Sequence, residues 1–140
     1  MAIAAELLSA YEATDFVVFD GGDQWVIKVG LASARLDALL DRHGATRAPV
    51  VTAFNPRSRV LAPAVNLARH RSLVRMLEER ELPFLLGEGR DPSGRWIAET
   101  ECIVFGVSLA EGLELARRFD QNAVVFIERG KPPRLEFPEG

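Results

Sequence analysis

The pattern of hydrophobic and polar positions predicts short apolar strands separated by amphipathic helices. Seven segments have the length and character of strands: 15–19, 25–29, 50–54, 82–86, 101–105, 123–127 and, most weakly, 134–137. Helical spacing predicts one helix before the first strand and three more, at about 36–43, 63–81 and 109–119. The order β-β-α-β-α-β-β-α-β-β after the first helix predicts an α/β fold, with α+β as the alternative. In it, helices cover a mixed sheet of six or seven strands.

Residues 50–54 are expected to form a central strand of this sheet. The segment is rich in β-branched residues, and Asn55-Pro56 ends it because proline has no N–H for the ladder. Its apolar run, like that of 103–105, is typical of a strand covered on both faces. We therefore predict that both are interior strands and that 124–127 lies beside one of them.

Local signals place the turns and helix ends. Gly21-Gly22 predicts the turn of a β-hairpin, and residues 87–96 form the most loop-like segment of the chain. Ser108 and Glu111 have the spacing of a capping box, which predicts a helix start there. His70 is expected on the solvated face of the long third helix.

Length and composition indicate one globular domain over residues 1–140, with 48% hydrophobic and 26% charged residues. A formal net charge of −3 argues against broad nucleic-acid binding, which needs a basic excess. No apolar run approaches the length of a membrane span, and Glu6 interrupts any signal-peptide core, so we expect no membrane partner. The single cysteine, Cys102, forbids an internal disulfide, which favours a cytoplasmic setting, and packing is its expected role.

The chain lacks the ligands of a usual metal or haem site. With one cysteine and two histidines, His43 and His70, a zinc site of the common four-ligand kind cannot be assembled. We expect no structural zinc, no haem and no other cofactor. No nucleophile motif marks the chain as an enzyme, so enzyme and binding protein stay as alternatives.

The strongest candidate site is a cationic turn that leads from the central strand into the long helix. A helix start offers unpaired N–H groups, and arginine adds a fork suited to phosphate or carboxylate. We predict that the protein binds a small anionic ligand, phosphate- or nucleotide-like, through these residues. The predicted site consists of Asn55, Arg57, Ser58, Arg59, Asn66, Arg69 and Arg90. The alternative is a structural salt-bridge network in which Glu88 or Asp91 pairs with the arginines.

Two other functions stay open. Carboxylates at Glu88, Asp91, Glu99 and Glu101 could serve a metal-dependent hydrolase or nuclease, although their spacing matches no ligand motif. A protein–protein adaptor is the third option. Gln121 and Asn122 are left outside the main site, because they begin a strand and would lie far from Asn55 if the two strands were parallel. Trp25 and Trp96 are expected in the core or at a rim.

Several short motifs keep a fixed order from about Tyr11 onward. They are Val-Thr-Ala-Phe-Asn-Pro at 51–56 with Ser58 and Arg59, Asn-Leu-Ala-Arg at 66–69, Gly-Glu-Gly-Arg-Asp-Pro at 87–92 with Trp96, Phe-Gly-Val-Ser at 105–108 with Glu111, and Phe-Asp-Gln-Asn-Ala at 119–123. Together they resemble an uncharacterised bacterial family, the domain of unknown function 3293. The resemblance implies a small bacterial cytoplasmic protein and carries over no activity, substrate or catalytic residue.

Overall fold

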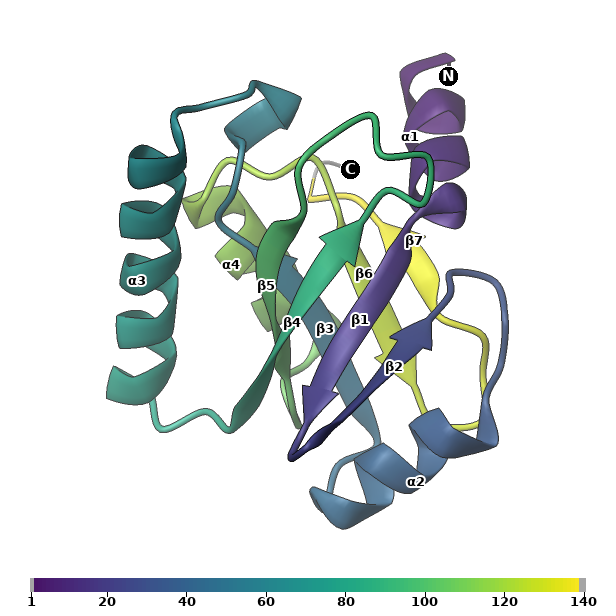
Figure 1. The fold of residues 1–140 in the computed structure, drawn as a ribbon. Helices are drawn as coiled ribbons and strands as arrows, with labels where there is room; N and C mark the ends of the chain where they lie inside the picture. The colour runs from purple at the N-terminus through teal and green to yellow at the C-terminus, as the bar shows by residue number, and fades with distance from the viewer. Residues whose placement is uncertain (1, 139–140) are drawn as a thin grey trace.

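Seven strands and four helices make up the computed structural model, which describes residues 2–138 (Figure 1). The helices are α1 (Ala2–Ala13), α2 (Ala34–Arg42), α3 (Pro63–Glu79) and α4 (Leu109–Arg118), with a short 3-10 turn, η1 (Pro56–Ser58). The strands are β1 (Asp15–Asp20), β2 (Asp23–Ile27), β3 (Arg47–Thr52), β4 (Phe84–Arg90), β5 (Glu99–Val104), β6 (Val124–Glu128) and β7 (Arg134–Glu136). This confirms the predicted α/β class and element order. Among the described residues, no helix has the length and apolarity needed to cross a membrane.

The strands form one curled sheet in the order β2-β1-β4-β5-β3-β6-β7. β3 lies between β5 and β6, which confirms the predicted interior strands and the predicted neighbour of 124–127. All six neighbouring pairs of described strands are antiparallel, where the sequence suggested a mixed sheet. The end of β3 therefore lies beside the start of β5 and the start of β6.

Successive side chains of each strand point to opposite faces of the sheet, and apolar side chains are buried on both faces. On one face, Val50 of β3 and Ile103 of β5 pack with apolar residues of α2. On the other, Val51 and Cys102 pack with α3 and α4. Burial raises the pKa of the Cys102 thiol to about 12, so this cysteine packs as a small hydrophobe, as expected.

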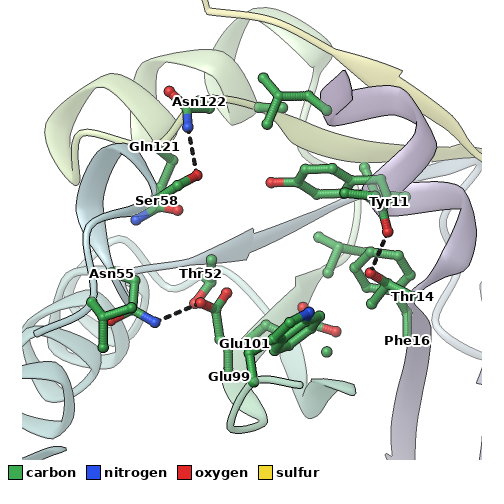
Figure 2. A pocket seen from close by; sticks show the side chains of 18 residues that line it. Tyr11, Thr14, Phe16, Thr52, Asn55, Ser58, Glu99, Glu101, Gln121 and Asn122 are labelled. Carbon is green, nitrogen blue, oxygen red and sulfur yellow. Dashed lines mark hydrogen bonds between the residues drawn. The ribbon is translucent and has the colours of Figure 1, made fainter. Parts of the chain in front are cut away.

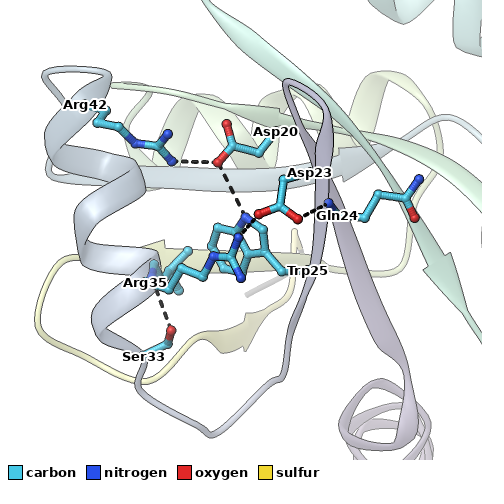
Figure 3. Close-up of polar contacts among 8 residues, drawn as sticks. Asp20, Asp23, Gln24, Trp25, Ser33, Arg35 and Arg42 are labelled. Carbon is cyan, nitrogen blue, oxygen red and sulfur yellow. Dashed lines mark hydrogen bonds and ion pairs between the residues drawn. The ribbon is translucent and has the colours of Figure 1, made fainter.

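α2 covers only one end of the first face, and polar contacts anchor it to the β1–β2 hairpin (Figure 3). Asp20 accepts a hydrogen bond of 2.6 Å from Arg42 Nη2 and a longer one of 3.5 Å from Trp25 Nε1. Arg35 pairs with Asp23, and its guanidinium lies 4.9 Å from the centre of the Trp25 ring. The opposite end of this face lies below α1 (Figure 1).

Three local predictions were wrong. β4 extends through Arg90, although glycines at 87 and 89 indicated a loop. β3 begins at Arg47 and includes Pro49, which lies opposite Phe126 of β6 and against Gly112 of α4. His70 is only 8% exposed, because its side of α3 turns toward the ring of Phe54.

Candidate functional site

A cavity of about 340 Å³ opens at the end of the sheet that α2 leaves uncovered (Figure 2). Its floor consists of side chains from β1, β3, β5 and β6 together with Gly89 of β4, and α1 contributes Leu7, Ala10 and Tyr11. The turn after β3 and the loop between β4 and β5 complete the wall. The polar residues of the lining are Tyr11, Thr14, Thr52, Asn55, Ser58, Glu99, Glu101, Gln121 and Asn122.

Two glycines of β4 make room for two glutamates of β5. Gly89 pairs with Glu99 in the sheet register, and Gly87 pairs with Glu101. Residues opposite each other in a ladder project to the same face, so β4 presents no side chain where β5 presents its carboxyls. Glu99 and Glu101 are two residues apart and share that face.

Glu101 is buried and Glu99 is half-buried, and neither has a cationic partner among the described residues. Glu101 is 4% exposed, and its Oε1 has no hydrogen-bond partner within the described part of the chain. Burial raises the pKa of Glu101 well above its ordinary value, and the nearby charges of Glu99 and Glu88 act in the same direction. Burial also raises the pKa of Glu99, while a hydrogen bond from Asn55 partly opposes this shift.

Asn55 links the turn after β3 to β5 and to α3. Its Nδ2 donates to Glu99 Oε2 at 2.7 Å, and its Oδ1 accepts from Asn66 Nδ2 at 2.8 Å and from Leu61 N at 2.9 Å. Asn66 Oδ1 in turn accepts from the backbone N–H of Asn55 at 2.9 Å. Because each amide is held by several bonds, the orientation of the Glu99 carboxyl is fixed by the first turn of α3.

The turn that carries Asn55 has an unusual backbone. Asn55, Arg57 and Ser58 have φ angles of 46°, 54° and 60°, in the left-handed region that side chains other than glycine seldom adopt. Arg57 N donates to Asp120 O at 2.7 Å, and Asn122 Nδ2 donates to Ser58 Oγ at 2.8 Å, so residues before β6 hold this conformation. Strain of this kind concentrates at functional sites.

Gln121 and Asn122 belong to the cavity lining, contrary to the sequence interpretation. β6 runs antiparallel to β3, so the start of β6 lies beside the end of β3. Gln121 Nε2 donates to Phe54 O at 3.0 Å. Because β3 and β5 are antiparallel, α3 and α4, which follow them in the chain, begin at opposite ends of the sheet.

The predicted cationic site is divided by the fold. Asn55 and Ser58 line the cavity. Asn66 lies outside the lining and donates a hydrogen bond to Asn55. None of the four arginines belongs to the lining. Arg69 donates to Ala53 O at 2.7 Å and to Phe119 O at 2.5 Å, which ties the end of β3 to the end of α4.

The other arginines make contacts at the surface. Arg90 Nε bonds Glu88 Oε1 at 2.8 Å on β4. Arg57 lies 4.0 Å from Asp120. The backbone N–H of Arg59 bonds Pro56 O at the end of η1.

The acidic group proposed for a metal is also divided. Only Glu99 and Glu101 line the cavity. Glu88 alternates with the two glycines of β4 and so projects to the other face. Asp91 accepts bonds from Ser93 and from Arg95 N within its own loop. Within the described residues, no three histidine, cysteine, aspartate or glutamate side chains are grouped to hold a metal ion.

Aromatic and aliphatic side chains surround the mouth of the cavity. The Tyr11 hydroxyl points into it (Figure 2), and Trp96 of the β4–β5 loop is also part of the lining. Burial is the main cause of a raised pKa at Tyr11, and the nearby charges of Glu99 and Glu101 raise this pKa further. Val60 and Ile97, on the loops that border it, are 86% and 81% exposed.

Part of this site had a signal in the sequence. The alternation of Glu99, Glu101 and Ile103 places the glutamates on the face of a buried strand, and that spacing could have marked them as buried carboxyls. Tyr11 had no such signal, because its position on α1 predicts only an amphipathic helix. Its proximity to β5 follows from the tertiary fold alone.

Fold and site describe a small α/β domain whose curled antiparallel sheet holds an acidic, aromatic cavity at one end. The family model described as "Protein of unknown function (DUF3293)" matches residues 51–124, more than half of the chain, and the protein belongs to this family. The matched segment contains Asn55, Glu99, Glu101 and Gln121 of the lining, whereas Tyr11 precedes it. No curated protein and no solved structure matches the chain.

Proposed function

We propose that the protein is a binding domain for a small organic molecule, which enters the cavity below α1. The cavity volume of about 340 Å³ falls within the range of small-molecule sites. Apolar walls combined with a few fixed polar groups are the usual composition of such sites. The observation that carries the proposal is the pair of carboxyls at the base of this cavity, the buried Glu101 and the half-buried Glu99.

The charge of the lining favours a neutral or cationic ligand over the anionic one that the sequence suggested. The described lining contains two glutamates and no lysine, arginine or histidine. An anion placed here would meet buried carboxyls without a compensating charge. Arg69, the half-buried arginine of the sequence-based site, already donates to two backbone carbonyls.

Nuclear magnetic resonance with a library of small compounds tests the proposal. A ligand in the cavity should shift the side-chain amide signals of Asn55, Gln121 and Asn122 and the indole N–H signal of Trp96. Gly89→Ala adds a methyl group to the cavity floor and should weaken these shifts. Gly22→Ala adds the same group in the hairpin turn, where no atom lies within 4 Å, and should leave them unchanged. Compounds that shift only signals outside the lining would contradict the proposal.

A metal-independent hydrolase is the second candidate. Buried carboxyls with raised pKa values are suited to proton donation near neutral pH, and Glu101 has such an environment beside a second carboxyl. Hydrolysis of a bound compound that persists in a chelator and disappears in Glu101→Gln would favour this function over simple binding. The bacterial cytoplasm stays our proposed setting, with the unpaired Cys102 as its support.

A further inference from the structure

The carboxyl pair at the base of the cavity has no internal charge partner. Glu101 is more than nine-tenths buried, and its Oε1 bonds to nothing in the described residues. No lysine, arginine or histidine of the described chain forms an ion pair with Glu99 or Glu101. A buried polar atom without a partner is costly, so an unpaired carboxyl oxygen at a cavity indicates a missing hydrogen-bond donor.

The rest of the lining defines the kind of donor that fits. Asn55 already donates to Glu99 and holds that carboxyl in one orientation, so only part of its acceptor capacity is used. Tyr11, Phe16 and Trp96 contribute aromatic surface to the same cavity. Aromatic faces attract cations, and a carboxylate pairs best with a group that carries both positive charge and N–H donors.

We infer that the cavity recognises the protonated amino group of a small organic amine, with Glu101 and Glu99 as its acceptors and the aromatic side chains around its carbon skeleton. This inference rests on the proposed binding function and specifies the ligand class. Binding replaces the proton of Glu101 with the ammonium group: the carboxyl O–H bond breaks, the proton passes to solvent, and no other bond changes. Affinity should therefore rise as the pH increases, for as long as the ligand stays protonated.

The groups around Glu101 act in one direction in this process. The charges of Glu99 on β5 and Glu88 on β4 oppose its ionisation, and Tyr11 on α1 is the other titratable group that lines the cavity. A bound cation relieves that opposition, whereas a neutral or anionic ligand of the same shape does not. The inference therefore predicts that ligands of equal size differ in affinity according to their charge.

Three compounds of matched shape provide the test: benzylamine, benzyl alcohol and benzoate. Dissociation constants for the full chain would be measured at pH 5.5, 7 and 8 by titration calorimetry. Proton release would be recorded with a pH indicator in weakly buffered solution. We expect benzylamine to bind at least about 10-fold more tightly than the other two, as for a hydrogen bond between charged groups. We also expect its affinity to rise with pH and its binding to release a proton.

Two variants locate the effect. Glu101→Gln keeps the shape of the side chain and should weaken benzylamine binding about 10- to 100-fold while removing its pH dependence. Glu114→Gln makes the same chemical change on the exposed side of α4 and should bind like the wild type. Circular dichroism checks that each variant is folded. The pH dependence of benzylamine binding is measured on the wild type, so this part of the test does not depend on the folding of a variant.

The possible outcomes distinguish this inference from the proposed function. If benzyl alcohol or benzoate binds as tightly as benzylamine, or if Glu101→Gln binds benzylamine normally, the amine inference is wrong and the binding domain stands. If none of the three binds at millimolar concentration, the inference is again overturned. In that case, the absence of any cavity ligand in the compound library would overturn the proposed function as well.

Discussion

Gly89 of β4 lies directly opposite Glu99 of β5, so β4 presents no side chain to this glutamate, whose carboxyl accepts a hydrogen bond from Asn55. A Cβ atom at Gly89 would meet its nearest neighbours at 3.6 Å or more, which is ordinary contact. At Gly87, two residue pairs along, the same atom would lie 2.5 Å from Val17 O. The two glycines thus serve different purposes: Gly87 permits close approach of β1, and Gly89 leaves volume for the cavity.

This difference predicts that substitution by alanine lowers the free energy of unfolding at Gly87 and changes it little at Gly89. Gly87→Ala should lower the free energy of unfolding by about 1–3 kcal/mol, because the backbone of β1 must move to admit the methyl group. Gly89→Ala should change it by less than about 1 kcal/mol, since the methyl fits and the unfolded chain loses freedom. Urea denaturation measures both. Equal losses at the two positions would contradict the assignment of Gly89 to the cavity.

The amide pair of Asn55 and Asn66 should be a major source of stability at this end of the sheet. Asn66 is 5% exposed, and Asn66→Ala would leave the Asn55 N–H and one acceptor position of Asn55 Oδ1 without partners. We expect a loss of about 2–3 kcal/mol in the free energy of unfolding. Ser72→Ala, on the exposed side of the same helix, should cost less than about 0.5 kcal/mol. A loss as small as that of the control would show that water replaces these bonds.

Arg69 should act as a structural residue. Arg69→Ala removes the donors to Ala53 O and Phe119 O, and we expect it to lower the free energy of unfolding by about 2 kcal/mol. Arg75→Ala, an exposed arginine on the same helix, is the matched control and should change little. Thermal unfolding with and without phosphate would complete the comparison. A stabilisation of the wild type by phosphate that Arg69→Ala abolishes would instead restore the anion site.

The stability of the protein should depend on pH through Glu101. A carboxyl whose pKa is raised in the folded state holds its proton more tightly there than in the unfolded chain. Its contribution is complete below pH 4.5, the ordinary pKa of a glutamate, and declines as the pH rises toward the folded-state pKa. Glu101→Gln removes this loss, so the variant should gain stability relative to the wild type between pH 5 and pH 8. Parallel urea titrations at several pH values measure the difference. A constant difference would mean that Glu101 is ionised in the folded protein.

The sequence was informative where local chemistry decides the structure. Apolar runs located β3 and β5 as interior strands, and the spacing of Ser108 and Glu111 identified the capping box of α4, which is present. Prolines and glycines misled the interpretation in the sheet. Pro49 lies within β3 opposite Phe126 of β6, and the ladder between β3 and β5 begins only at Val50. The two glycines lie within β4, Gly87 because β1 approaches closely and Gly89 because it borders the cavity.

The site was less predictable, because its residues meet only through strand direction. Charge and helix position brought the arginines to attention, yet the direction of β6 decides that Gln121 lies beside Phe54. A parallel arrangement, which the sequence could not distinguish from the antiparallel one, would have moved it to the far end of the sheet. The glutamates are likewise of a residue type common at surfaces, and the cavity that they line is completed by residues of α1, far from them in the sequence.

The position of α1 divides the cavity between two parts of the chain. The carboxyls and the amide pair of Asn55 and Asn66 lie within residues 51–124, which the family model matches. Tyr11 and its neighbours on α1 precede this segment. A change in this N-terminal helix would alter the cover of the cavity and leave its acidic base in place. The wall of the proposed ligand site can therefore be varied through one terminal segment, without disturbance of the sheet that holds the charged groups.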